Sequence, residues 1–591
     1  MALGTYDFAL SIGGEAGQGI ATPGDILARI VVRRGLNLCT YNAYQSIIRG
    51  GHIFLTLRIC DEPVDNHGDK LDLLLCLNQD TMDRHQHLMG PGTRIVYNSD
   101  SIKPGESKGA DLCGIPVAEL TQSRNKLIQN TVAMGVVISL MGIDFAVLEE
   151  SLSLRFQRQG QQVIDENVTV ARAGFDYANA NFQPFPQTVP EGPTPLAVWS
   201  GNDAIAMGGA VAGVKFYAAY PMSPASGVLH WMAQNARNLG IMVRQVEDEI
   251  GVANMVVGAA HAGTRAMCAT SGGGFALMTE AIGSAGMMEI PSVFINVQRA
   301  GPSTGVPTKT EQGDLWQALG ASQGDYERLI VAPSDALDAF NTMPELFNLT
   351  DKYQCPGILL SDLYISEGRF SFDPADVNMH PKIERGALIT KPAAANGYMR
   401  YKNTESGISP RALPGLEGYV HVVATDEHDE NSTLLSDEFT NPHKRRMMVE
   451  KRARKMESIF DDIVPPEIEG PADAEVTLIG WGSTYGMIKE AIQQLKDQGV
   501  EANQLHLKWI VPFHADQVIK IFSQAKRTII VENSFSGQFA RYIRSETGLS
   551  ADGHIRKYDG EPFMPHHIAD GVKEQLSGKT DRYVPYQEVV V

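Results

Sequence analysis

Clustered cysteines are the first thing that this sequence of 591 residues lacks. The closest two of its six cysteines, Cys60 and Cys76, are too widely spaced to form a CxxC-type pair. Zinc and iron–sulfur sites need several thiolates near one another in the chain, so we expect neither here. Most of the cysteines should be small buried hydrophobes in a reducing compartment. If the protein carries out redox chemistry, we expect its metal in another chain.

A surplus of basic charge is also missing. Asp and Glu outnumber Lys and Arg by 69 to 50, which gives a net charge of −19. Such a surface repels phosphate backbones and anionic lipid, so we expect no binding to nucleic acid or membranes. The most apolar stretch, 132–143, is shorter than the ~20 residues that span a bilayer. The N-terminal residues do not resemble a signal peptide, so we expect a cytoplasmic protein.

What the sequence does contain is three segments in which strands alternate with helices. A chain of this length suits three or four domains of roughly 150 residues. The alternation indicates α/β domains with largely parallel sheets. We predict three α/β domains and two connections, at 1–182, 183–195 (a proline-rich linker), 196–388, 389–470 (a connecting region) and 471–591. The basic cluster at 443–455 is predicted to be a solvated amphipathic helix.

The first segment opens with a strand at 6–12 and a glycine-rich turn at 13–19, followed by a helix. Glycines let backbone N–H groups approach a phosphate at a helix N-terminus, but this spacing differs from that of a dinucleotide-binding loop. A structural turn is therefore favoured over an anion-binding one. Arg49-Gly50-Gly51 leaves the same two interpretations open, a tight turn or an arginine that binds an anion.

In the second segment, polar residues follow the ends of predicted strands. The run 220–226 comes directly after the strand at 216–219, and its two prolines hold Ser223 at the carboxyl end of that strand. Open α/β sheets bind their ligands at this end. Ser226 could simply cap the next helix. The acidic run 247–249 opens another helix, where carboxylates also interact favourably with the helix dipole.

A triple-glycine turn at 270–274 and Arg299 complete this edge of the predicted sheet. Arg299 leaves the end of a strand beside a Gly-Pro turn that carries two hydroxyls, Ser303 and Thr304. A guanidinium group is a planar fork of donors that suits a carboxylate. From these residues alone, a substrate-binding arginine and a structural ion pair are equally supported.

Four runs of this segment together resemble the α subunit of 2-oxoacid:ferredoxin oxidoreductases: YPMSPAS, EDEIGVANMVVGAAHAG, TSGGGFALMTEAIG and EIPSVFINVQRAGPSTGVPTKTEQGDL. The glycine-rich start and Arg49-Gly50-Gly51 resemble the γ domain that is fused to the 2-oxoglutarate type of this subunit. The third segment is similar to the transketolase C-terminal domain, through GWGS at 480–483, PF at 512–513 and VEN at 531–533. The resemblance covers nearly the whole chain. It implies a γ domain, a thiamine-diphosphate pyrimidine-type domain and a transketolase C-terminal-like domain.

The resemblance implies that thiamine diphosphate lies between the central domain and a separate β subunit. A carboxylate must then bond the ring nitrogen of the cofactor's aminopyrimidine. Glu249 best matches the family glutamate, with Glu247 as the alternative. Pro221 and Gly272 fall in motifs that border the cofactor, and no residue of this chain is expected to bind a metal ion.

The resemblance also assigns the substrate's surroundings. Ser223 matches a family threonine whose hydroxyl lies near the reacting centre, and Met222 stands where that motif has isoleucine. Serine keeps the hydroxyl but loses the methyl group that restricts its rotation. Arg299 would bind the 2-oxoacid carboxylate, with Thr304 as a hydroxyl partner. Lys309 is a candidate for a second, distal carboxylate, although an ordinary surface lysine is the simpler interpretation.

The implied reaction converts a 2-oxoacid and CoA into acyl-CoA and CO₂ and passes two electrons to ferredoxin. Gly313-Asp314-Leu315 lacks the rest of a diphosphate-binding motif, so the diphosphate, Mg²⁺ and a [4Fe–4S] cluster are assigned to the β subunit. Two αβ heterodimers are expected to associate, and this chain should be inactive alone. The fused layout favours 2-oxoglutarate, with pyruvate or branched-chain 2-oxoacids as alternatives. A ferredoxin-independent transketolase-like component is a further alternative.

Overall fold

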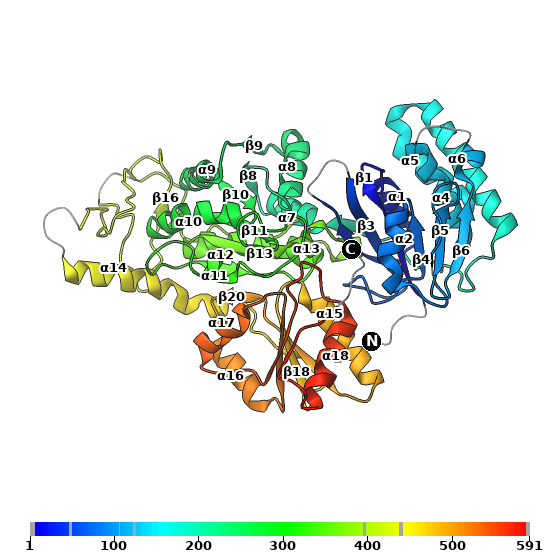
Figure 1. Cartoon of the computed structure of the whole chain (residues 1–591). Helices are drawn as coiled ribbons and strands as arrows, with labels where there is room; N and C mark the ends of the chain where they lie inside the picture. The colour runs from blue at the N-terminus through cyan, green and yellow to red at the C-terminus, as the bar shows by residue number, and fades with distance from the viewer. Residues whose placement is uncertain are drawn as a thin grey trace.

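A computed structural model describes residues 6–45, 50–105, 107–121, 126–393, 397–435 and 441–586. Figure 1 shows three α/β units, the first in blue and cyan, the second in green and the third in orange and red. The predicted fold class is therefore confirmed. No helix within the described ranges is both long and apolar enough to cross a membrane.

The first unit is built on a mixed sheet in the order β6-β5-β4-β1-β3-β2-β14-β7. Its strands from the N-terminal segment are β1 (Asp7–Ala16), β2 (Asn37–Ala43), β3 (Gly50–Cys60), β4 (Leu73–Cys76), β5 (Arg94–Asn98) and β6 (Asp111–Ile115). The sheet packs against helices α1 (Ala21–Arg33), α4 (Lys126–Leu140), α5 (Phe145–Phe156) and α6 (Gln161–Asn181). Strands β1, β4, β5 and β6 are parallel, whereas β2 and β3 run antiparallel to their neighbours.

The glycine-rich start of the chain is mostly strand. Gly13 and Gly14 lie inside β1 and pair with Phe54 and Ile53 of β3. The prediction of a turn beginning at residue 13 was wrong, because β1 continues to Ala16. Gly13 serves close packing instead, since an added Cβ there would overlap the side chain of Thr81. The turn itself covers only the end of the run, where Gly17 and Gly19 have positive φ angles.

Two strands from the second segment extend the first sheet. β7 (Ala197–Ser200) and β14 (Arg369–Phe372) pair with each other, and Phe370 of β14 pairs with Cys39 of β2. Pairing between such distant parts of the chain leaves no local pattern in a sequence. The segment limits at 182, 195, 388 and 470 were drawn from local patterns alone, and they remain predictions.

The second unit has a sheet in the order β20-β12-β13-β11-β10-β8-β9. Its strands are β8 (Val214–Ala219), β9 (Met242–Gln245), β10 (Arg265–Thr270), β11 (Val293–Gln298), β12 (Leu329–Val331), β13 (Gly357–Asp362) and β20 (Trp509–Val511). Its main helices are α7 (Gly201–Val211), α8 (Ser226–Leu239), α9 (Glu249–His261), α10 (Gly272–Met287) and α12 (Ala336–Tyr353). Strands β10, β11 and β13 are buried throughout, as expected where helices cover both faces of a parallel sheet. Within this sheet β20, which comes from the third unit, pairs antiparallel with β12.

The third unit has a sheet in the order β17-β19-β18-β21-β22-β23. Its principal strands are β18 (Val476–Gly480), β19 (Ala502–His506), β21 (Thr528–Glu532) and β22 (Gly553–Arg556). Its helices are α15 (Thr484–Asp497), α16 (Ala515–Gln524), α17 (Gln538–Thr547) and α18 (Pro565–Leu576).

The basic cluster forms a helix, α14 (Pro442–Arg454), whose first half is largely exposed, as predicted, but the C-terminal end of the cluster is not solvated. Lys451 and Lys455 are buried, and their Nζ atoms lie 2.5 and 3.0 Å from the two carboxylate oxygens of Glu289. Burial alone would raise the pKa of Glu289, but the two lysines lower it. The carboxylate therefore stays charged in the interior. A run of charges is usually exposed, and here the neutralising partner belongs to a distant part of the sequence.

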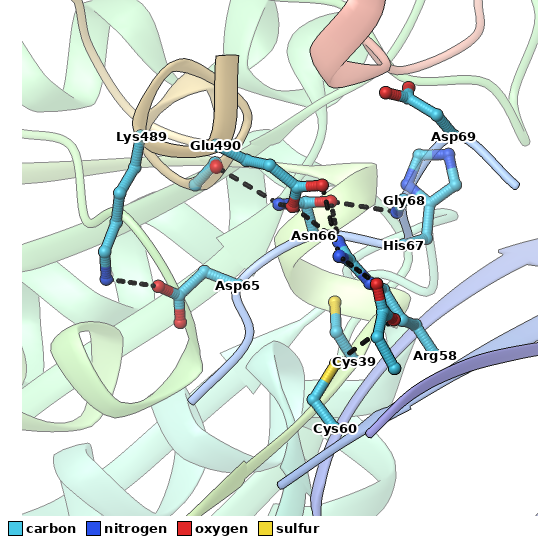
Figure 2. A network of polar contacts seen from close by, with 12 residues as sticks. Cys39, Arg58, Cys60, Asp65, Asn66, His67, Gly68, Asp69, Lys489 and Glu490 are labelled. Carbon is cyan, nitrogen blue, oxygen red and sulfur yellow. Dashed lines mark hydrogen bonds and ion pairs between the residues drawn. The ribbon is translucent and has the colours of Figure 1, made fainter. Parts of the chain in front are cut away.

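A buried polar network joins the first unit to α15 of the third (Figure 2). The Arg58 guanidinium donates to Asp7 at 2.9 Å and to both carboxylate oxygens of Glu490, at 2.5 and 3.1 Å. Asn66 donates to Glu490 at 2.7 Å and to the Gly486 carbonyl at 3.2 Å. Because these groups satisfy one another away from water, the network fixes how the first unit sits on the third.

Candidate functional site

The loops that follow β8, β10 and β11 meet at the carboxyl edge of the second sheet. They border a cavity of about 900 Å³, whose wall includes Met222, Gly272, Arg299 and Thr304. Of the residues singled out from the sequence, Gly272, Arg299 and Thr304 therefore line one space. Pro221 does not reach this wall and borders a neighbouring shallow groove beside α8 and β9.

Arg299 is attached to the loop that carries Ser223. Its Nη1 donates to the main-chain oxygen of Ser223 at 2.7 Å. Among the described residues Arg299 forms no ion pair, which argues against the structural alternative left open by the sequence. Burial lowers the pKa of Arg299, and the nearby Asp314 carboxylate opposes this shift. The guanidinium is thus partly desolvated, borders the cavity and has donors left for a ligand.

Glu249 occupies the first turn of α9. Asp248 caps this helix by accepting the Gly251 N–H at 2.7 Å. Glu249 is 3% exposed, and its Oε1 has no hydrogen-bond partner within the described part of the chain. Burial raises the pKa of this carboxyl group. Glu247, the alternative, is exposed.

The Glu249 carboxyl group faces the first turn of α10. An added Cβ at Gly274 would overlap both Glu249 Oε1 and Thr270 Oγ1, so only glycine leaves room for them. An unpartnered buried carboxyl oxygen costs roughly 1–3 kcal/mol, and more when it is charged. A ligand that donates a hydrogen bond here would remove this cost, which fits the role of bonding an aminopyrimidine ring.

Two acidic residues of the site were missed by sequence reasoning. Asp314 accepts a 3.2 Å hydrogen bond from Asn296 and lies so close to Gly272 that an added Cβ there would overlap it. Burial raises the pKa of Asp314 to about 6 and that of Glu311, which lines the same cavity, to about 7. Gly313-Asp314 was considered only as a fragment of a diphosphate motif. The available signal in the sequence was the position of Gly313-Asp314 in the turn-rich segment that follows Arg299.

The third unit holds the segment that carries these acids. Gln312 and Asn533 bond reciprocally, since the Gln312 N–H donates to the Asn533 carbonyl at 2.7 Å and the Asn533 N–H donates to Gln312 Oε1 at 3.0 Å. Gln312 Nε2 also donates to the Trp481 carbonyl at 2.9 Å, and Gln538 donates to that of Gly313 at 2.6 Å. The third unit therefore fixes one wall of the cavity in the second.

A second cavity, of about 500 Å³, lies where the three units meet. Tyr41 comes from the first unit, Lys309 from the second and Glu561 from the third; Tyr41 and Lys309 both bond the Glu561 carboxylate. In the same wall the Nε2 atoms of His52 and His85 are 3.0 Å apart. Lys309 is thus paired at a junction between units.

Other expectations concern metals and the first unit. Within the described ranges, no group of three or more His, Cys, Asp or Glu side chains is arranged to hold a metal ion. All six cysteines are buried and carry free thiols. Gly50 and Gly51 have positive φ angles and begin strand β3, where its register with β1 shifts, so the structure places them in an irregular strand end rather than in a turn. Arg49, the residue proposed to bind an anion, lies outside the described residues.

Three family models match the chain. Residues 9–177 match "Pyruvate ferredoxin/flavodoxin oxidoreductase", and residues 208–449 match "Pyruvate flavodoxin/ferredoxin oxidoreductase, thiamine diP-bdg". Residues 474–568 match "Pyruvate:ferredoxin oxidoreductase core domain II".

Proteins similar over nearly the whole chain belong to the same family of oxidoreductases. The chain is 31% identical to subunit alpha of 2-oxoacid:ferredoxin oxidoreductase 2 from Aeropyrum pernix, over 98% of this chain and 99% of the relative. It is 29% identical to the 2-oxoglutarate oxidoreductase subunit KorA of Mycobacterium tuberculosis, over 96% and 91%. Its structure is similar to 2-oxoglutarate:ferredoxin oxidoreductase from Magnetococcus marinus, solved with 2-oxoglutarate, coenzyme A and succinyl-CoA bound. That similarity has a TM-score of 0.90, with 32% identity over 96% of this chain and 99% of the other.

Proposed function

Because this chain belongs to the 2-oxoacid:ferredoxin oxidoreductase family, as an alpha subunit, we propose that it works in the CoA-dependent oxidative decarboxylation of 2-oxoglutarate. The products are succinyl-CoA, CO₂ and reduced ferredoxin. The observation that carries the proposal is the arrangement at the edge of the second sheet. There, among the described residues, the Glu249 carboxyl group has a buried oxygen without a partner and the Arg299 guanidinium forms no ion pair. The Glu249 oxygen is suited to bond a cofactor, and the Arg299 guanidinium is suited to bind a substrate carboxylate.

Thiamine diphosphate, when bound, supplies an electron sink for the carbonyl carbon of the substrate. Glu249 would bond the aminopyrimidine through its free Oε1, and Gly272 would border the cofactor. Pro221 is the less supported contact, because it lines the groove beside the cavity.

Arg299 would bind the carboxylate next to the keto group through the guanidinium donors that Ser223 leaves free. Thr304 lines the same cavity and supplies a hydroxyl for that carboxylate. Ser223 follows the end of β8 and would supply a hydroxyl near the reacting carbonyl, although it is Met222, the residue before it, that lines the cavity. The Lys309 ammonium, already paired with Glu561, is no longer favoured for the distal carboxylate.

A β subunit would close the cavity and hold the diphosphate, Mg²⁺ and a [4Fe–4S] cluster, from which ferredoxin takes the electrons. Exposed apolar side chains near the cavity support a protein partner there: Leu277, Trp316 and Phe535 are 49, 47 and 62% exposed. We propose a dimer of αβ heterodimers as the complete enzyme. A cytoplasmic location belongs to the proposal and is supported by the six buried, free cysteines.

CoA would enter through the second cavity. The space combines apolar walls, among them Phe54 and Met564, with cationic side chains such as Lys70 and Arg84. Pantetheine suits the first kind of surface and phosphate the second. Val306 lines this cavity and Thr304, two residues earlier in the same loop, lines the first, so the thiol would arrive beside the first cavity.

The proposal is tested by purifying this chain with its β subunit and measuring reduction of a low-potential acceptor. We expect CoA-dependent reduction with 2-oxoglutarate that exceeds reduction with pyruvate or branched-chain 2-oxoacids. If the enzyme prefers another 2-oxoacid, the proposed substrate is wrong but the proposed class of reaction stands. Ketol transfer without any electron acceptor would instead support the transketolase-like alternative and refute the proposal.

A further inference from the structure

Two arginines of the third unit lie on the same face of its sheet. Arg556 is the last residue of β22, and Arg582 opens β23 (Arg582–Tyr583), where it pairs with His554. Alternate side chains of a strand point to the same face, so His554 and Arg556 share one face of the sheet. Because Arg582 lies opposite His554, its side chain emerges on that face as well. The strand pairing therefore places two guanidinium groups next to each other.

Both guanidinium groups converge on one main-chain oxygen. Arg556 Nη1 and Arg582 Nη2 each donate to the Phe535 carbonyl at 3.4 Å. Neither arginine forms an ion pair with a carboxylate in the part of the chain that the structure describes. Glu532 lies beside Arg556 in the sheet, but its carboxylate accepts the Phe539 N–H at 3.0 Å in the first turn of α17. In a chain with a net charge of −19, these two cations therefore lack a carboxylate partner among the described residues.

Two exposed aromatic rings flank these cations. The Phe535 ring is 62% exposed, and its centroid lies 5.8 Å from the guanidinium carbon of Arg582. Tyr558 is 40% exposed and packs edge-on against Phe535, with 5.1 Å between the ring centroids. We call Arg556, Arg582, Phe535 and Tyr558 the arginine–aromatic patch. Arginine and aromatic side chains are enriched where proteins bind one another, so this composition is typical of a protein-binding surface.

The arginine–aromatic patch continues the rim of the first cavity. Phe535 and Tyr558 line that cavity as well, together with Arg299 of the second unit. Trp316 adjoins the same rim through Gln538, whose carbonyl accepts the indole N–H at 3.2 Å. A free anion would neutralise the arginines but leave the rings in water, whereas a protein surface would cover both. A subunit that closes the cavity would therefore cover the patch too.

We propose that the arginine–aromatic patch binds a carboxylate side chain of the β subunit, set in an apolar surface that covers Phe535 and Tyr558. This inference rests on the proposed function, in which a β subunit closes the first cavity. A guanidinium fork binds a carboxylate through two parallel hydrogen bonds, and two adjacent forks keep donors that the Phe535 carbonyl does not use. The covering surface would exclude water and so strengthen the pair. The third unit thereby helps to hold the β subunit over the site.

The test measures the affinity between the two full-length chains. The co-expressed αβ complex is diluted in roughly 0.05 M and 0.5 M salt, and its dissociation is followed by mass photometry. Arg582→Glu should weaken association about tenfold to a hundredfold at low salt, because it sets a negative charge against the partner's carboxylate. The loss should shrink at high salt, where charges are screened. Arg556→Gln, which only removes a cation, should weaken association about tenfold at low salt. Because Arg582 is exposed, its substitution should leave the melting temperature of this chain unchanged.

The matched control is Arg446→Glu, which makes the same change of charge on α14, where the side chain is 79% exposed. It should leave association unchanged. The inference is overturned if both patch variants associate within about twofold of wild type, or if their loss is equal at both salt concentrations. It is also overturned if association is normal but KM for ferredoxin rises, because the patch would then bind the electron acceptor. Association is measured without turnover, so a stable complex that oxidises no 2-oxoacid would refute the proposed function alone.

Discussion

Replacing Arg299 by alanine tests the centre of the proposed site. The substitution removes the only cation among the described residues that line the first cavity. A substrate carboxylate would then be desolvated without its partner, and truncating one member of such a pair costs about 2–5 kcal/mol. Arg299 is partly exposed and already uses one N–H on Ser223, so we expect its loss to weaken binding of the transition state by roughly 2–4 kcal/mol. At ~1.4 kcal/mol per tenfold, kcat/KM should fall about 30-fold to 700-fold.

The way the loss divides between KM and kcat carries further information. Loss of a carboxylate contact alone raises KM, whereas loss of the bond to the Ser223 carbonyl also disturbs the catalytic loop and lowers kcat. Arg299→Lys should be intermediate, at about tenfold, because it keeps the charge but loses the planar fork. Arg446→Ala is the control, since that side chain is 79% exposed on α14. If kcat/KM of Arg299→Ala with 2-oxoglutarate stays within about twofold of wild type, Arg299 does not bind the substrate.

Three further outcomes are expected. Glu249→Gln should retain its melting temperature but slow hydrogen–deuterium exchange at the thiazolium carbon roughly 100-fold, and normal exchange would move the role to Glu247. Burial raises the pKa of Asp314 from 3.8 to about 6. The unfolded chain therefore loses this proton at a lower pH than the folded chain, and the free energy of unfolding falls as pH rises between these two values. Asp314→Asn should therefore flatten the fall in the urea-unfolding free energy over this range, and an unchanged slope would contradict it. Glu289→Gln leaves two buried lysines without a full counter-charge and should lower stability by about 3–5 kcal/mol, seen as a melting temperature several degrees lower; a shift below one degree would show that the pair is compensated.

The parts of this site that the sequence predicts are those that lie within short runs. Ser223, Arg299 and Thr304 each come shortly after a strand, so a reading of strand ends brings them to one edge of a sheet. Of the two acids considered for the cofactor, burial separates Glu249 from Glu247, and burial depends on how α9 packs against α10.

What the sequence does not reveal depends on distant partners. The charges of the buried Lys451 and Lys455 are balanced by Glu289, which lies 162 residues before Lys451 in the chain, and β2 has β14, from a distant segment, as its second neighbour in the sheet. Periodicity and turn chemistry are local, so they cannot show which strand closes a sheet or which carboxylate neutralises a charge. Gly13 shows the same limit, since its close neighbour Thr81 is identified only by the packing of the fold.

The pairing of β2 with β14 also has a consequence for how the chain is made. Thr40 of β2 and Arg369 of β14, which bond each other in the finished sheet, are 329 residues apart in the chain. At ~5–20 residues per second, this edge of the first sheet waits roughly 16–65 seconds for its neighbour during translation. An open strand edge is a site of mispairing, and β2 must remain available throughout this interval. The residue after it, Tyr44, lines the second cavity together with Glu561, so its final surroundings form only when nearly the whole chain has emerged.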